Sequence, residues 1–341
     1  MKKITIATII FAIWSSISIA NEVNIFSARH YDSDIQLYER FTNKTGIKVN
    51  IVSGKDKALQ KRITEEGEDC IADLYITADA GRLGAFQEKG MFQKGINSSK
   101  KIKAAVPVNF RTNYWTGIAK RARIMYYSPE RVSANELNGM TYEGLADPKW
   151  KGRIVIRKSN NVYNQSLVAS LIQNNGKKKT AEWAKDVVAN MARDSKGNDR
   201  AQILAVAAGE ADLAVANTYY LALMLSGKKG AEQQAAAKKV KPFFPNQDGR
   251  GTHMNISGGG ILKHAPNKSN AIKLLEFLLT KEAQQHIVNN TFEYSMIDDV
   301  EPHELVAQMG LGFKQDLKTK VSSYGKKQAD ALEIMLASKW K

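Results

Sequence analysis

Short apolar runs alternate with longer amphipathic segments along most of this 341-residue chain, and this alternation constrains its fold more than any other feature. Residues 23–28, 48–53 and 74–77 are predicted strands. Residues 32–45 and 56–66 are predicted helices, each followed directly by a glycine. Strand and helix in this order and at this spacing predict a parallel sheet with helices on both faces.

The middle of the chain repeats the pattern. Residues 117–127 are predicted to form one long strand or a strand pair, and 211–216 a buried strand. Helices are expected at 165–173 and 218–225, and the tail from 302 to 341 is expected to be helical and polar. We therefore predict an α/β fold of two doubly wound lobes, with a ligand cleft beyond the carboxyl ends of the strands.

Residues 1–20 have the order of features found in a secretory signal peptide. Lys2 and Lys3 precede an apolar run at 4–13, and small residues at Ser18 and Ala20 fit the site that a signal peptidase reads. The alternative is a buried N-terminal strand or helix. We expect cleavage after Ala20 and export.

The formal net charge of +16 comes from basic residues scattered along the chain. No basic run is interleaved with aromatic residues, which a single-strand nucleic-acid site would need, so we expect a solvated surface and no nucleic-acid partner. The sequence also has no Gly-x-Ser-x-Gly, His-Glu-x-x-His or phosphate-loop motif, so we do not expect an enzyme. The single cysteine, Cys70, excludes an internal disulfide.

Tyrosines occur at three predicted junctions between a strand and the following helix. They are Tyr31, preceded by His30; Tyr163; and the pair Tyr219 and Tyr220. Each tyrosine alone is explained by packing or exposure, but three junctions of a doubly wound fold meet at its binding edge. A phenol has a pKa near ~10, and a hard trivalent cation can displace its proton and bind the oxygen. Ferrous iron repays less of the cost of deprotonating each tyrosine than ferric iron does, so reduction of a bound ferric ion offers a route for its release.

Several segments resemble the periplasmic ferric-ion-binding proteins of ABC transporters, in order along the whole mature chain. The matching segments are 24–31, 121–128, 159–166, 216–220 and 255–267. The His-Tyr and Tyr-Tyr pairs are specific to the iron-binding members, whereas the Ser-Gly-Gly segment marks only the wider type II periplasmic-binding fold.

The resemblance implies a hinged, two-lobed monomer that closes on ferric iron in the periplasm and delivers it to an inner-membrane ABC permease. Residues 21–120 with 248–297 would form the first lobe, and residues 121–247 with 298–341 the second.

Carried over residue by residue, the resemblance makes Tyr31 the ligand from the first lobe. Tyr163, Tyr219 and Tyr220 would be ligands from the second lobe. His30 stands where some relatives have a further ligand, with water as the alternative. Four tyrosines would leave less need for a synergistic anion, and the sequence identifies none.

A charge-balancing role follows for an arginine, because four phenolates around one ferric ion leave a net negative charge. The resemblance implies Arg123, and Arg121 lies two residues away on the same strand face. An alternative function is open at this point: a small anion held by Arg121, Arg123 and helix N-termini, with the tyrosines stacking or hydrogen bonding.

Overall fold

The computed structural model describes residues 21–29 and 31–341. The predicted signal peptide, residues 1–20, and the candidate ligand His30 lie outside the described residues, so both stay predictions. No helix in the described ranges combines the length and the apolar composition needed to cross a membrane.

The first lobe begins with the strands and helices that the sequence predicts. Its first three strands are β1 (Glu22–Ser27), β2 (Lys48–Ser53) and β3 (Leu74–Ala78). Its first three helices are α1 (Ser33–Thr45), α2 (Asp56–Glu66) and α3 (Ala80–Glu88). Strand β1 pairs in parallel with both β2 and β3, as predicted. Gly46 ends α1 in the left-handed conformation, with φ of 69°, which a residue without Cβ adopts at little cost.

The sheet of the first lobe is mixed: the first three strands are parallel as predicted, and a fourth strand of opposite direction joins them. Strand β8 (Met254–Ile261) is antiparallel to β3 and to β4 (Trp115–Tyr127), which is one continuous strand. The reason is topological. Strand β4 carries the chain out of the first lobe and β8 brings it back, so the two run in opposite directions.

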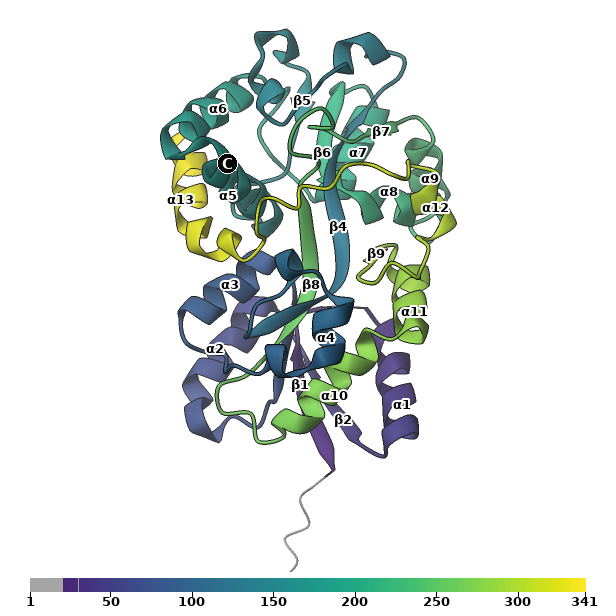
Figure 1. Cartoon of the computed structure of the whole chain (residues 1–341). Coiled ribbons are helices and arrows are strands. Elements are labelled where there is room, and N and C mark those ends of the chain that lie inside the picture. Colours follow the sequence, from purple (N-terminus) through teal and green to yellow (C-terminus); the bar gives the residue numbers. More distant parts are fainter. Residues whose placement is uncertain (1–20, 30) are drawn as a thin grey trace, which may run out of the picture.

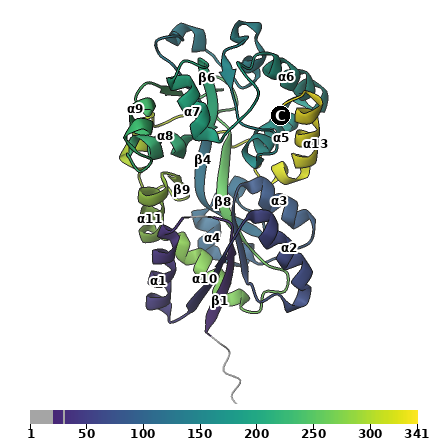
Figure 2. The same cartoon turned by 180° about the vertical axis from the view of Figure 1, so that it is seen from behind.

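The second lobe is built on the far end of β4. There β4 pairs with β6 (Leu213–Asn217) and β7 (Lys241–Phe243), and β5 (Ile154–Val155) is parallel to β6. Its helices include α5 (Val162–Asn175), α6 (Lys177–Ala189), α7 (Asp199–Ala207), α8 (Thr218–Leu225) and α9 (Ala231–Ala237). Figure 1 shows the two α/β lobes, with β4 and β8 running between them; Figure 2 shows the same arrangement from behind.

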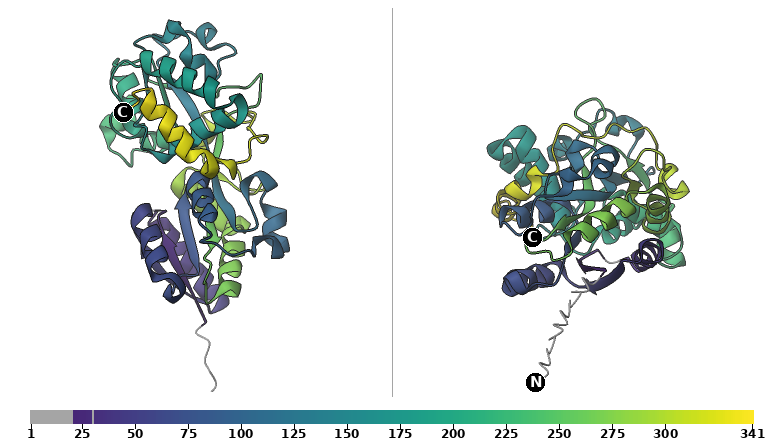
Figure 3. Two further views of the ribbon diagram at one scale, coloured as in Figure 1. Left: turned by 90° about the vertical axis from the view of Figure 1, so that its left-hand side faces the viewer. Right: turned by 60° about the horizontal axis from the view of Figure 1, so that its bottom comes forward.

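The remaining α-helices and the last strand complete the two lobes. They are α4 (Lys100–Ala105), α10 (Lys268–Leu278), α11 (Lys281–Thr291), β9 (Tyr294–Ser295), α12 (Glu304–Ala307) and α13 (Ser323–Ala337). The prediction of a helical tail was partly wrong, because the chain between α12 and α13 is irregular. Gly310 and Gly312 have positive φ there, which interrupts a helix. Helix α13 packs on α5 and α6 and also on α3 of the first lobe (Figure 3).

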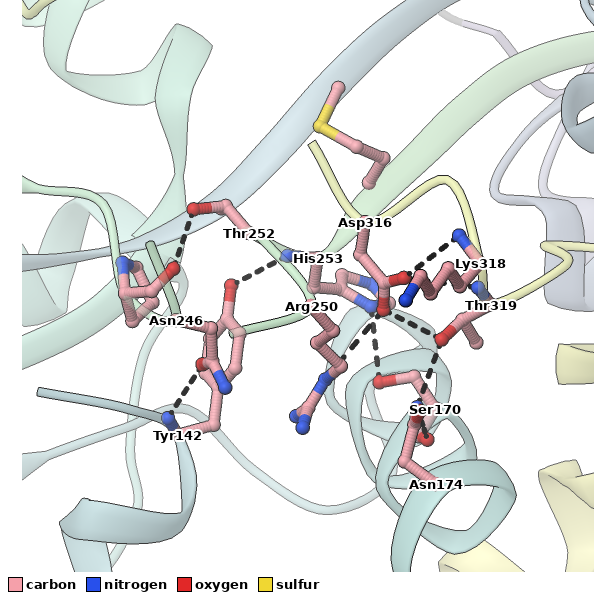
Figure 4. Close-up of polar contacts among 12 residues, drawn as sticks. Tyr142, Ser170, Asn174, Asn246, Arg250, Thr252, His253, Asp316, Lys318 and Thr319 are labelled. Atoms are coloured by element: carbon pink, nitrogen blue, oxygen red, sulfur yellow. Dashed lines mark hydrogen bonds and ion pairs between the residues drawn. The ribbon is translucent and has the colours of Figure 1, made fainter. Parts of the chain in front are cut away.

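The segment that enters β8 contacts second-lobe residues, although the predicted lobe limits place it in the first lobe. His253 lies against Ser170 of α5, with its Nδ1 3.2 Å from the hydroxyl oxygen, and its backbone N–H donates to the Tyr142 hydroxyl (Figure 4). Arg250 donates to Glu143 at 2.8 Å. The lobe limits themselves stay a prediction.

Candidate metal centre

The four predicted tyrosines line one cavity between the lobes. This cavity has a volume of about 620 Å³, and Tyr31, Tyr163, Tyr219 and Tyr220 all contribute to its wall. First-lobe residues from the ends of β1 and β3 complete one side, and residues from the start of α7 complete the other. Three junctions that are distant in sequence therefore meet at one place.

Each tyrosine lies at or just before the first turn of a helix. Tyr31 precedes α1, while Tyr219 and Tyr220 are the second and third residues of α8, directly after β6. The sequence placed Tyr163 ahead of its helix, but α5 begins at Val162. The side chain of Asn161 accepts a hydrogen bond from the Tyr163 backbone N–H at 2.9 Å and so starts the helix earlier. Helix N-termini favour negative charge on these oxygens.

The phenol groups of the second lobe lie close together. The Tyr219 hydroxyl donates to the Tyr163 hydroxyl oxygen at 3.3 Å, and the Tyr219 and Tyr220 rings have centroids 4.3 Å apart. Among residues 21–29 and 31–341, no cluster of three or more His, Cys, Asp or Glu side chains could hold a metal. The oxygen donors that the structure gathers are therefore phenolic, a donor set suited to a hard cation.

The surroundings keep Tyr31, Tyr219 and Tyr220 protonated. Burial, followed by the negative charge of Glu293, raises the pKa of Tyr31 well above its usual value. Burial and the neighbouring tyrosines likewise raise the pKa of Tyr219 and of Tyr220. At neutral pH these groups are uncharged, and a ligand that binds their oxygens as phenolates must displace the protons.

Guanidinium groups lie against two of the tyrosine rings. The Arg29 guanidinium carbon is 4.6 Å from the centroid of the Tyr31 ring, and those of Arg121 and Arg157 are each 5.4 Å from the Tyr163 ring. A cation in this position stabilises a nearby phenolate. The sequence had offered only Arg121 and Arg123 for this role.

Arg123 has different partners, although it is buried on the same strand. It donates to Asp199 at 2.9 Å and to Asn164 at 2.6 Å, and these contacts hold it within the second lobe. Residues two apart on a strand share a face but are well separated along it, so they meet different neighbours. The geometry therefore places Arg121, rather than Arg123, beside the tyrosines.

Sequence reasoning missed a buried carboxylate under the cavity. Glu293 accepts hydrogen bonds from Arg29 at 2.6 Å and from Arg121 at 2.8 Å, and its side chain is 0% exposed. Burial would raise the pKa of Glu293, but the two arginines outweigh burial and lower it, so the group is ionised. Arg29 could have been noticed because it lies two residues before Tyr31. Glu293 gave no signal, since 264 residues separate it from Arg29.

The charged residues in the rest of the cavity wall are mainly basic. Lys55, Arg82, Arg200 and Lys229 contribute to it, against one acid, Asp56. An excess of positive charge at a cleft attracts anionic ligands and offsets the negative charge that metal-bound phenolates create.

Comparison with known proteins places this chain among bacterial solute-binding proteins. Residues 69–309 match the family of bacterial extracellular solute-binding proteins. Iron uptake protein A1 of Synechocystis is 46% identical over 322 residues, which cover 94% of this chain and 88% of that protein. The Fe(3+)-binding periplasmic protein of Serratia marcescens is 30% identical over 275 residues, covering 80% of this chain and 78% of the relative.

Among solved structures, the Trichodesmium protein FutA, also called IdiA, in complex with iron and citrate ligands is similar over its whole length. It is 49% identical with a TM-score of 0.89, and the match covers 94% of this chain and 100% of that one.

Proposed function

The chain belongs to the family of bacterial extracellular solute-binding proteins, and from this premise we propose that it captures ferric iron through Tyr31, Tyr163, Tyr219 and Tyr220. In the proposed cycle the two lobes close on the ion in the periplasm and deliver it to an inner-membrane ABC importer. The resemblance found in the sequence is confirmed at the level of the family. Its members bind and carry solutes, so the chain is a binding protein and not an enzyme.

The observation that carries the proposal is the meeting of tyrosines from both lobes in one cavity. Four phenolate oxygens suit a hard, trivalent ion, whose charge can displace the phenol protons. The described residues offer no competing His, Cys, Asp or Glu cluster. Ferric iron bound here would bridge the lobes, because Tyr31 belongs to the first lobe and the other tyrosines to the second.

The relatives support iron as the ligand. The Synechocystis relative is an iron uptake protein, the Serratia relative is an Fe(3+)-binding periplasmic protein, and the Trichodesmium structure holds iron and citrate. The Serratia relative also supports a periplasmic location. Delivery to a permease and a monomeric state remain expectations from the family resemblance.

The contacts of the arginines weigh against the alternative of a small anion held by Arg121 and Arg123. Both side chains are 1% exposed and are already engaged in ion pairs, Arg121 with Glu293 and Arg123 with Asp199. The charge of each guanidinium is therefore largely balanced by its carboxylate partner, and burial shields it from solvent, both of which disfavour the capture of a separate anion.

Titration with ferric iron, supplied as a weak chelate and followed by visible absorption, tests the proposal. Ferric phenolate complexes are coloured through charge transfer, whereas an anion bound to arginine is colourless. We expect colour in the wild type, and Tyr219→Phe and Tyr220→Phe should each weaken the affinity at least about tenfold through loss of one ligand bond.

Tyr127→Phe is the matched control, because Tyr127 lies on β4 outside the cavity and its variant should bind as the wild type does. A wild-type protein that stays colourless with ferric iron would overturn the proposal.

A further inference from the structure

Glu293 joins two arginines beneath the tyrosine cavity. Its carboxylate accepts from Arg29 Nη1 at 2.6 Å, from Arg121 Nη1 at 2.8 Å and from the Ser257 hydroxyl at 3.0 Å. These partners come from the loop after β1, from β4 and from β8. The carboxylate thus ties both strands that run between the lobes to the loop that carries Tyr31.

The backbone around Glu293 is shaped to turn this side chain inward. Helix α11 ends at Thr291, and Phe292 adopts the left-handed conformation with φ of 59°, an uncommon state for a bulky residue. Phe292 thereby faces the cavity while Glu293 enters the interior. Strand β9 follows at once and pairs with β4 at Lys120, the neighbour of Arg121. The strained residue is held because both flanking elements are fixed.

The two arginines face tyrosines on opposite lobes. Arg29 lies 4.6 Å from the Tyr31 ring, and Arg121 lies 5.4 Å from the Tyr163 ring. Glu293 therefore controls the position of both guanidinium groups, and its own negative charge reduces the positive potential that they produce at the phenolate oxygens.

Building on the ferric site proposed above, we infer that Glu293 is a positioning residue that sets the preference of the cavity for ferric over ferrous iron. Four phenolates give a ferric complex a charge of −1 and a ferrous complex a charge of −2. Positive charge nearby stabilises the ferrous complex more than the ferric one, because the ferrous complex carries more negative charge. The carboxylate of Glu293 limits that positive charge and so favours the ferric state.

Glu293→Gln tests this inference, because it keeps the shape of the side chain and removes its charge. The reduction potential of bound iron is measured from the charge-transfer band as the applied potential is varied. We expect the ratio of ferric to ferrous affinity to fall about tenfold, a rise in potential of about 59 mV for a one-electron couple. Glu282→Gln is the matched control, since Glu282 lies in the first turn of α11, the helix that precedes Glu293, and its side chain is 52% exposed.

A second comparison covers the case in which Glu293→Gln does not fold. Arg29→Gln removes a positive charge and should lower the potential. The double variant Arg29→Gln/Glu293→Gln restores the local charge and should return the potential to about the wild-type value. The difference between the last two variants isolates the charge of Glu293.

Equal potentials in the Glu293→Gln and Glu282→Gln proteins, or in Arg29→Gln and the double variant, would overturn the inference. So would a folded Glu293→Gln protein that no longer binds iron, since Glu293 would then govern binding rather than the choice of oxidation state. A colourless wild type would instead reject the ferric site itself, which keeps the two failures distinguishable.

Discussion

At the scale of single residues, the tyrosines of the cavity are weak acids that burial makes weaker still. The pKa of Tyr31, Tyr219 and Tyr220 is raised, chiefly by burial. A cation that binds them must supply enough energy to remove their protons. This cost discriminates against cations of lower charge and makes binding sensitive to acid.

The affinity for ferric iron should therefore fall steeply as the pH drops. One proton leaves each of the four tyrosines that would bind as a phenolate, and each displaced proton changes the affinity about tenfold per pH unit. We expect a loss of about ten-thousandfold per unit, measured by competition with a chelator of known pH dependence. An affinity that stays constant from neutral to mildly acidic pH would contradict ligation by phenolates.

His253 gives a second prediction at this scale, for stability. Burial, together with the positive charges of Arg123 and Arg250, lowers the pKa of His253 to about 3 from its usual 6.5. The unfolded chain takes up a proton near pH 6.5 and the folded protein does not. The contribution of the neutral His253 to the free energy of unfolding is therefore complete above about pH 6.5 and is lost progressively as the pH falls toward 3.

Between about pH 3 and 6.5, the free energy of unfolding of the His253→Asn variant should depend less on pH than that of the wild type. The two slopes should differ by the uptake of up to one proton on unfolding. Urea denaturation at several pH values measures the slope. Above pH 7, where the wild-type histidine is neutral in both states, the difference between the two proteins should be constant. Equal slopes below pH 6 would show that His253 does not titrate as expected.

At the scale of elements, the helices α3, α5 and α13 make a contact between the lobes. This contact consists of glycines and small polar side chains. The Ser166 hydroxyl of α5 donates to Asp79 at 2.6 Å, and Asp79 caps α3 from a backbone with φ of 118°. Helices α3 and α13 meet at Gly84 and Gly325. A Cβ added to Gly325 would lie 2.3 Å from the Ala85 backbone nitrogen, so no larger residue fits.

Gly325→Ala should therefore lower the free energy of unfolding by about 1–3 kcal/mol, because the new methyl group forces backbone segments apart. Denaturant unfolding of the apo protein measures the effect. Gly249→Ala is the control, since its Cβ would meet only a carbonyl oxygen, at 3.7 Å, and its φ is ordinary. Equal stability of the two variants would show that α3 and α13 separate freely.

At the scale of the whole molecule, the cavity lies between two lobes that contribute unequal numbers of tyrosines to it. Tyr31 comes from the first lobe, and Tyr163, Tyr219 and Tyr220 come from the second. The strands β4 and β8 run between the lobes, so relative motion of the lobes changes the distance from Tyr31 to the other three. Binding at the second lobe and closure of the cleft are thus separable events.

Tyr31→Phe should separate them. The variant keeps three phenols on the second lobe, so it should still develop weakened colour with ferric iron, but iron should no longer pull the lobes together. Small-angle scattering with and without iron measures this as a decrease in radius of gyration that the wild type shows and the variant lacks. Equal compaction in both proteins would mean that Tyr31 does not bridge the cleft.

Much of the fold follows from local pattern. A few neighbouring residues encode the strands around Phe26 and Ile76 and the end of α1 at Gly46. The position of Tyr219 and Tyr220 directly after a buried strand is encoded locally as well. Local sequence determines these features because hydrophobic periodicity and backbone freedom act over one or two turns. The α/β class, the two lobes and the candidate tyrosines could therefore be predicted.

Only the tertiary structure decided the reversed direction of β8, the choice of Arg121 over Arg123 beside Tyr163, and the place of Glu293. Each depends on which distant segments pack together: Arg29 and Glu293 meet across 264 residues of sequence. Charges act through space rather than along the chain, so the balance of charge around the tyrosines exists only once the lobes have folded and β4 and β8 have brought their partners into contact.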